Sequence, residues 1–117
     1  MKRAVVITAS NRAFKGVYED LSGQILLKGL KKLGYEINDV QILPDDQAQI
    51  SDAIQTAINS EIDLVVTTGG TGVSAFDVTP EATAPLVLKP MPGILEALRA
   101  YAREQVPTTD LSRGIAG

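Results

Sequence analysis

Three short runs recur along the chain as candidate strands, and each leads through a turn into a stretch with apolar residues at helical spacing. The runs cover residues 4–8, 36–43 and 62–67. The first is continuous and rich in β-branched residues, as is typical of a strand buried on both faces of a parallel sheet, and the third is predicted to be another buried strand. This alternation predicts an α/β fold with three α/β/α layers around a doubly wound, mostly parallel sheet, joined by right-handed crossovers.

Four helices are expected between and after these strands. The first begins at Asp20, a candidate N-cap, and stops before Gly34, while the second begins near Asp46. The third begins with Thr79 as its N-cap and Pro80 at the first helical position, and runs to about residue 88. The fourth carries an apolar stripe over residues 95–101 and ends near residue 105. We expect this stripe to pack in the core first, with an oligomer contact as its alternative.

Composition excludes several kinds of chemistry. The 117 residues include no Cys, His or Trp, which removes thiolate nucleophiles, imidazole bases and Cys/His metal sites. A bound metal would therefore be a hard cation with oxygen ligands. Hydrophobic residues make up 44% of the chain, and no linker interrupts it, so we expect one domain over residues 1–117.

Charge and hydropathy bear on partners. The chain has 11 Lys plus Arg against 14 Asp plus Glu, a net charge of −3, which argues against nucleic acid as the main partner. No apolar run approaches the ~20 residues that a membrane-spanning helix needs. We expect a cytoplasmic protein that contacts no membrane.

The loops after the three strands should meet at one edge of the sheet, because ligands of doubly wound sheets bind at the carboxyl ends of the strands. These loops cover residues 8–16, 43–46 and 68–77. The third is the most informative, since three glycines within four residues let the backbone turn tightly and aim N–H groups at an anion. A tight strand-to-helix turn without a ligand is the alternative interpretation.

No Lys follows the glycines, so the loop is not a Walker loop. The negative charge of a bound phosphate would have to be neutralised by Arg12, Lys15, Arg113 or a metal ion. Arg113, which follows Ser112, offers a guanidinium fork that suits phosphate, although a surface arginine is usually just solvated.

Two aspartates at strand ends are candidate magnesium ligands. Asp45 and Asp77 each sit just beyond a strand, and two carboxylates plus nucleotide phosphates commonly complete a magnesium shell. Helix capping is the alternative, with Asp46 capping the second helix and Asp77 the third. Ser10 offers a hydroxyl at the end of the first strand, where ordinary turn chemistry is again the alternative.

Several motifs together resemble one known family. Val65 to Gly72, Asp77 to Thr83 and Met91-Pro92-Gly93 closely resemble the MogA/MoaB family of molybdenum cofactor biosynthesis, whose relatives include gephyrin and the plant Cnx proteins. Ser10-Asn11-Arg12 and Pro44-Asp45-Asp46 extend the resemblance, which spans the whole chain. Thr71-Gly72 and residues 77–83 favour the adenylyltransferase branch over the molybdenum insertase and CinA types.

The resemblance implies a molybdopterin adenylyltransferase, which transfers AMP from Mg-ATP to the molybdopterin phosphate and releases pyrophosphate. It also implies Mg²⁺ as the metal, a homotrimer, and a molybdenum insertase as a partner. Asp45 and Asp77 match family carboxylates important for activity and are the expected catalytic residues and metal ligands. The residues expected to bind substrate are Ser10, Thr68, Gly69, Gly70, Thr71, Gly72, Pro92, Gly93, Ser112 and Arg113. The alternative is a non-catalytic pterin- or nucleotide-binding oligomeric module of the same fold.

This sequence departs from the family pattern at three places. Asn11 stands where the family usually has Asp, and Phe76 stands where many members have Arg. Family chains continue past the region of residues 114–117 into a further strand and helix, whereas this sequence stops at Gly117. We therefore expect a domain that lacks the family's C-terminal strand and helix, through truncation or with impaired activity.

Overall fold

A computed structural model describes all 117 residues and contains one three-stranded parallel sheet. The strands are β1 (Ala4–Ala9), β2 (Gln41–Leu43) and β3 (Leu64–Thr68), arranged in the order β2-β1-β3. The central strand β1 pairs with β3 over residues 4–8 and with β2 over residues 7–9. The predicted parallel α/β architecture is confirmed.

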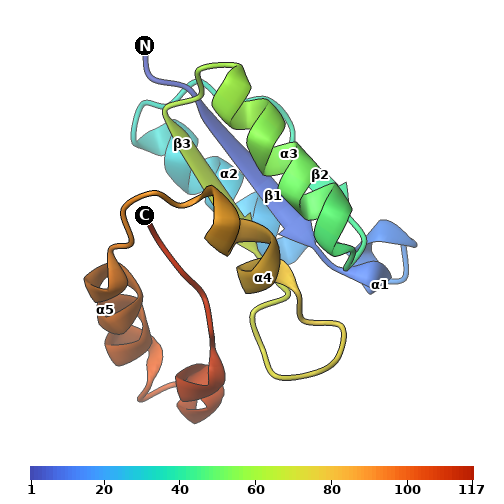
Figure 1. The fold of residues 1–117 in the computed structure, drawn as a ribbon, viewed down its shortest axis with the longest axis vertical. Helices are drawn as coiled ribbons and strands as arrows, with labels where there is room; N and C mark the ends of the chain where they lie inside the picture. Colours follow the sequence, from blue (N-terminus) through green and yellow to red (C-terminus); the bar gives the residue numbers. More distant parts are fainter.

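Helices cover both faces of the sheet. In Figure 1, α3 lies over one face of the sheet and α2 over the other, while α5 lies to one side, separated from α4 by the C-terminal segment. None of the helices combines the length and the apolarity needed to cross a membrane. The helices are α1 (Asn11–Phe14), α2 (Leu21–Lys32), α3 (Gln47–Asn59), α4 (Thr79–Thr83) and α5 (Pro92–Ala102), and η1 (Ala84–Leu86) and η2 (Pro107–Leu111) are 3₁₀ turns.

Alternating side chains of β1 build a core on each face of the sheet. Ile7 packs with Ile50 and Ile54 of α3, whereas Val6 packs with Leu30 of α2. Ile7 and Ile50 are completely buried. A strand that buries both of its faces explains the continuous apolar run, and it fixes the direction in which the carboxyl edge of the sheet points.

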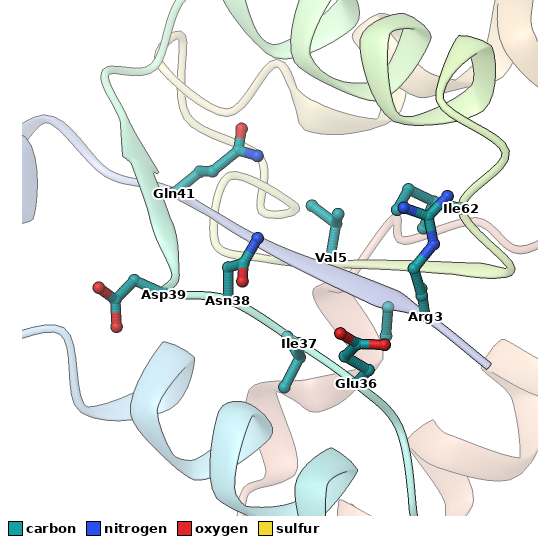
Figure 2. Close-up of a pocket in the computed structure, with 9 residues that line it drawn as sticks. Arg3, Val5, Glu36, Ile37, Asn38, Asp39, Gln41 and Ile62 are labelled. Atoms are coloured by element: carbon teal, nitrogen blue, oxygen red, sulfur yellow. The ribbon is translucent and has the colours of Figure 1, made fainter. Parts of the chain in front are cut away.

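The second strand is shorter than predicted because its register with β1 shifts. An isolated bridge joins Arg3 to Glu36, and regular pairing resumes only where Ile7 lies opposite Gln41. The segment between them therefore holds one residue more than β1 does, and the extra residue interrupts the ladder as a bulge does. Figure 2 shows the cavity of about 150 Å³ at this point, with Val5 and segment 36–41 among its walls.

Two of the predicted N-caps are confirmed and one is wrong. Asp20 accepts a hydrogen bond from the Gly23 N–H at 3.0 Å, and Asp46 accepts one from the Gln49 N–H at 3.1 Å. Thr79 is already inside α4, whose N-cap is Val78 and receives no side-chain hydrogen bond. The Thr79 hydroxyl is instead committed to the glycine loop, as described below.

The third helix ends earlier than predicted. α4 stops at Thr83 and passes into the 3₁₀ turn η1, which contains Pro85. Proline has no N–H to donate to the carbonyl four residues back, and its ring clashes with that carbonyl, so an α-helix does not continue through it. The fourth helix, α5, likewise stops at Ala102, three residues before the predicted end.

Candidate functional site

A cleft of about 630 Å³ opens at the carboxyl edge of the sheet. Its walls come from the segments after all three strands and from the first turn of α2, so the predicted convergence of the loops is confirmed. Ligands of doubly wound sheets bind in this position. The lining residues are Thr8, Ala9, Ser10, Asn11, Arg12, Tyr18, Glu19, Asp20, Leu21, Ser22, Asp45, Gly69, Gly70, Ser74, Phe76 and Asp77.

Reciprocal hydrogen bonds fix Asp45 at this cleft. The Asn11 N–H donates to Asp45 Oδ2 at 3.1 Å, and the Asp45 N–H donates to Asn11 Oδ1 at 2.9 Å. Asp45 caps no helix, because the neighbouring Asp46 caps α3. The other carboxylate oxygen of Asp45 has no backbone donor and is available to a ligand.

The glycine loop needs glycine at its first two positions. Gly69 and Gly70 have φ angles of +88° and +69°, a region that residues with a side chain rarely adopt. A Cβ at Gly69 would collide with the Ala9 carbonyl oxygen, and one at Gly70 would collide with the Thr79 hydroxyl. The Thr79 hydroxyl donates to the Gly69 carbonyl at 2.9 Å, and the Thr79 N–H donates to the Gly70 carbonyl at 3.1 Å. The turn is therefore packed tightly against β1 and the start of α4.

Consecutive backbone donors in this loop have no acceptor in the protein. The N–H groups of Gly69, Gly70 and Thr71 take part in no hydrogen bond within the chain. Gly69 and Gly70 line the cleft. Unpaired backbone donors at successive positions of a tight turn are a feature of anion-binding loops in proteins.

Asp77 is held at the cleft by its own loop and does not cap α4. The Ser74 N–H donates to Asp77 Oδ2 at 2.9 Å. Hydrogen bonds from the Ser74 side chain and backbone, aided by the Gly72 backbone and the charge of Arg113, hold the pKa of Asp77 below its ordinary value. Asp77 is consequently a carboxylate at neutral pH, in the state that a cation would require.

The remaining predicted site residues lie outside the cleft lining. The Thr68 hydroxyl donates to the Ser22 hydroxyl at 3.1 Å, and Ser112 donates to the Thr71 hydroxyl at 3.4 Å. The Arg113 guanidinium is bound to Glu81 and to loop carbonyls. Pro92 and Gly93 form the first turn of α5. The residues that the structure brings together at the cleft are therefore Ser10, Asp45, Gly69, Gly70 and Asp77, with Thr68, Thr71, Gly72, Ser112 and Arg113 around the glycine loop.

Sequence reasoning missed a buried carboxylate in the cleft wall. Asp20 is 9% exposed, and besides capping α2 it accepts a hydrogen bond from the Thr8 hydroxyl at 2.8 Å. Tyr18 also lines the cleft, where its hydroxyl lies 2.8 Å from the Ser10 hydroxyl. Neither contact follows a fixed sequence spacing, since Thr8 and Asp20 meet only because α2 begins above the end of β1.

The cleft is acidic. Glu19, Asp20, Asp45 and Asp77 line it, and Arg12 is the only basic lining residue. No group of three or more acidic residues is arranged to hold a metal by itself. A polyphosphate in this cleft would therefore need a cation to offset the surrounding carboxylates, and the ligand's own phosphates would have to complete the shell of that cation.

Comparison with known proteins points to one family. The family described as "Probable molybdopterin binding domain" matches residues 5–115. A molybdopterin adenylyltransferase of Helicobacter pylori is 41% identical over 117 residues, covering 96% of this chain and 65% of the relative. One of Pyrococcus furiosus is 42% identical over 113 residues, covering 96% of this chain and 66% of the relative. The chain thus spans just under two thirds of the length of these curated relatives.

Solved structures agree with the sequence matches. The Mog protein of Mycobacterium ulcerans, described as a molybdopterin biosynthesis protein, superposes with a TM-score of 0.93 at 36% identity, covering 100% of this chain and 76% of that one. MoaB of Pyrococcus furiosus, described as a tungsten cofactor synthesizing protein, gives a TM-score of 0.89 at 40% identity, covering 100% and 72%. From its residues, its fold and these likenesses, the chain belongs to the molybdopterin-binding domain family of MogA and MoaB.

Proposed function

We propose that the chain is a molybdopterin adenylyltransferase domain acting in molybdenum cofactor biosynthesis. In the proposed reaction an oxygen of the molybdopterin phosphate forms a bond to the α-phosphorus of ATP. The bond from that phosphorus to the bridging oxygen of pyrophosphate breaks, and pyrophosphate leaves with the electron pair of that bond. The names of the relatives support this reaction, and the cleft supplies the groups that it needs.

The unpaired backbone donors of Gly69, Gly70 and Thr71 are the observation that carries the proposal. Backbone N–H groups fixed in a rigid turn bind phosphate oxygens without reorganising when charge moves during the reaction. The bonds from Thr79 hold this turn before any ligand arrives. We assign the ATP phosphates to this loop, with Ser10 and Arg12 as further lining residues of the same cleft.

A magnesium ion fits the donor set of the cleft. Asp45 and Asp77 each accept a backbone N–H on Oδ2, and we assign the Oδ1 atom of each carboxylate to the ion. Carboxylate oxygens supplemented by phosphate oxygens are the ligands that Mg²⁺ prefers. When bound, the ion would offset the charge of the phosphates and of the acidic lining.

The residues of this chain would act by positioning and charge rather than by taking a proton. A phosphate nucleophile is already anionic at neutral pH, so the step needs no strong general base. This agrees with a chain that has no His or Cys. Asp45, held by Asn11, and Asp77, held by Ser74, are the proposed catalytic residues.

Further expectations belong to the same proposal. Pro92, Gly93 and Ser112 lie outside the cleft lining. We assign Pro92 and Gly93 to positions near the bound nucleotide, and Ser112 to a substrate contact. We propose a homotrimer, a molybdenum insertase as the protein that receives the product, and a cytoplasmic location where ATP is available. The trimer and the insertase are expectations drawn from the family, and the location is one drawn from the sequence.

Turnover tests the proposal directly. The chain would be incubated with molybdopterin, ATP and magnesium, and pyrophosphate release and adenylylated product would be measured together. We expect stoichiometric release of both products. Binding of nucleotide or molybdopterin without turnover would instead indicate the non-catalytic binding module, and no binding of either by folded protein would exclude both functions.

A further inference from the structure

Arg113 closes the base of the loop that carries Asp77. Its Nε donates to the Gly72 carbonyl at 2.8 Å, and its Nη2 donates to the Asp77 carbonyl at 2.9 Å. These two carbonyls flank the exposed residues 73–76, so one guanidinium joins both ends of the loop. The Arg113 N–H also donates to the Thr71 carbonyl at 2.8 Å.

Glu81 fixes the orientation of that guanidinium. Arg113 Nη1 donates to Glu81 Oε2 at 2.7 Å and Nη2 donates to Oε1 at 3.1 Å, which is a two-point contact between planar groups. The pair lowers the pKa of Glu81 and raises that of Arg113, so both remain charged over the neutral range. The four side-chain hydrogen bonds leave a single N–H of the five for any other acceptor.

Little else holds this loop. Residues 73–76 are exposed, and their side chains add no core packing. Thr79 anchors the glycines at one end of the loop. Within the loop the Ser74 N–H bonds to Asp77 Oδ2, and the Asp77 N–H bonds to the Ser74 carbonyl at 3.1 Å. These internal contacts shape the turn but do not tie it to the rest of the protein.

We propose that Arg113 is a positioning residue, which, held by Glu81, clamps the backbone of residues 72–77 so that the Asp77 carboxylate stays at the cleft. Its planar fork spans two carbonyls and a carboxylate, a geometry that the point charge of lysine does not reproduce. This role differs from the phosphate contact expected from the sequence. Its consequence for ligand binding rests on the proposed function, whereas its consequence for the loop does not.

Hydrogen exchange on ligand-free protein tests the clamp itself. In Arg113→Gln, the amides of Ser74, Phe76 and Asp77 should exchange about tenfold faster or more, because the loop opens without breaking the core. Glu81→Gln should also speed the exchange of these amides, but by less than Arg113→Gln does, since glutamine keeps an oxygen acceptor for Arg113. Arg113→Lys should not restore protection. Arg103→Gln is the matched control, because Arg103 forms an exposed pair with Asp110 at 2.7 Å away from the loop.

Magnesium-dependent ATP binding by calorimetry then tests the consequence for the site. We expect Arg113→Gln and Arg113→Lys to weaken it about tenfold or more, and Arg103→Gln to leave it unchanged. Loop exchange within twofold of the parent in both Arg113→Gln and Glu81→Gln would overturn the clamp, as would full rescue by Arg113→Lys. If the parent binds no nucleotide, the proposed function fails while loop exchange still decides the clamp. If Arg113→Gln fails to fold, loop exchange and ATP binding would both be measured on Glu81→Gln instead.

Discussion

At the scale of single residues, two adjacent aspartates have different tasks. Asp46 caps α3 through its contact with the Gln49 N–H, whereas Asp45 faces the cleft and is bound to Asn11. Capping needs only an oxygen acceptor, and Asn supplies one almost as well as Asp. A magnesium ligand needs the negative charge as well. The two roles therefore respond differently to the same substitution.

We expect Asp45→Asn and Asp77→Asn to keep the melting temperature of the parent and to lose most adenylyl transfer. Asp46→Asn is the matched control and should keep both properties, while Asp46→Ala should lower the melting temperature by loss of the cap. Thermal unfolding and pyrophosphate release would be measured on the same samples. Near-parental turnover in both Asn variants at the cleft would show that neither carboxylate is catalytic.

The Glu81–Arg113 pair should also leave a signature in the pH dependence of stability. Hydrogen bonding and the charge of Arg113 hold the pKa of Glu81 below its ordinary value of 4.5. A lowered carboxyl pKa means that the unfolded chain binds the proton more readily. The contribution of the pair is thus complete above about pH 5 and is lost as the pH falls below 4.5 toward the folded-state pKa. Unfolding of Glu81→Gln between pH 3 and 6 should show a shallower acid decline than the parent, and an identical decline would refute this assignment.

At the scale of elements, the glycine loop depends on two positions that tolerate no side chain. Ala at Gly70 has to adopt a φ of +69° and displace the Thr79 hydroxyl, and Ala at Gly69 meets the backbone of β1. The left-handed region alone costs about 1–2 kcal/mol for a residue with a Cβ. The same collision would break the contact that holds the turn in place.

Urea unfolding should therefore show that Gly70→Ala lowers the free energy of unfolding by about 1–3 kcal/mol. The loss should be larger for Gly69→Ala, because its new Cβ would collide with backbone atoms rather than with a side chain. Gly29→Ala is the matched control, because Gly29 lies inside α2 with open space at its Cβ position. That change should stabilise the protein by about 0.5–1 kcal/mol. Equal effects at Gly29 and Gly70 would contradict the conformational argument.

Features that depend on neighbouring residues in the sequence were predicted correctly, whereas features that depend on tertiary contacts were missed. The apolar run of β1 and the caps at Asp20 and Asp46 depend on neighbouring residues, and the structure confirms them. The start of β2 depends on its register with β1, which the sequence pattern does not encode. Asp20 enters the cleft because α2 starts beside Thr8, and that proximity exists only in the folded chain.

At the scale of the whole molecule, α5 leaves apolar side chains uncovered. It has no buried residue, and Ile94, Leu98 and Tyr101 are 46%, 58% and 85% exposed. The expectation that this stripe packs in the core first is therefore wrong, since α5 lies to one side of the sheet rather than over it. Contiguous exposed apolar surface is typical of protein interfaces.

We expect light scattering to give the mass of a homotrimer, and Leu98→Glu to shift the protein toward monomer without loss of helical circular dichroism. Charge at an interface core opposes association, whereas it is tolerated on a free helix surface. Ile25→Glu, on the exposed side of α2, is the control and should keep the parental mass. A parent that stays monomeric at micromolar concentration would contradict the proposed assembly.

The central claim is that the cleft is a magnesium-dependent nucleotide site built from the glycine loop and two carboxylates. The most direct test is a calorimetric titration of ATP into the folded chain, with magnesium and with a chelator, alongside Asp77→Asn and the control Asp46→Asn. We predict binding by the parent and by Asp46→Asn in magnesium, and affinity about tenfold lower or worse with the chelator or in Asp77→Asn. Absence of binding in magnesium, or equal affinity in all four samples, would contradict the account.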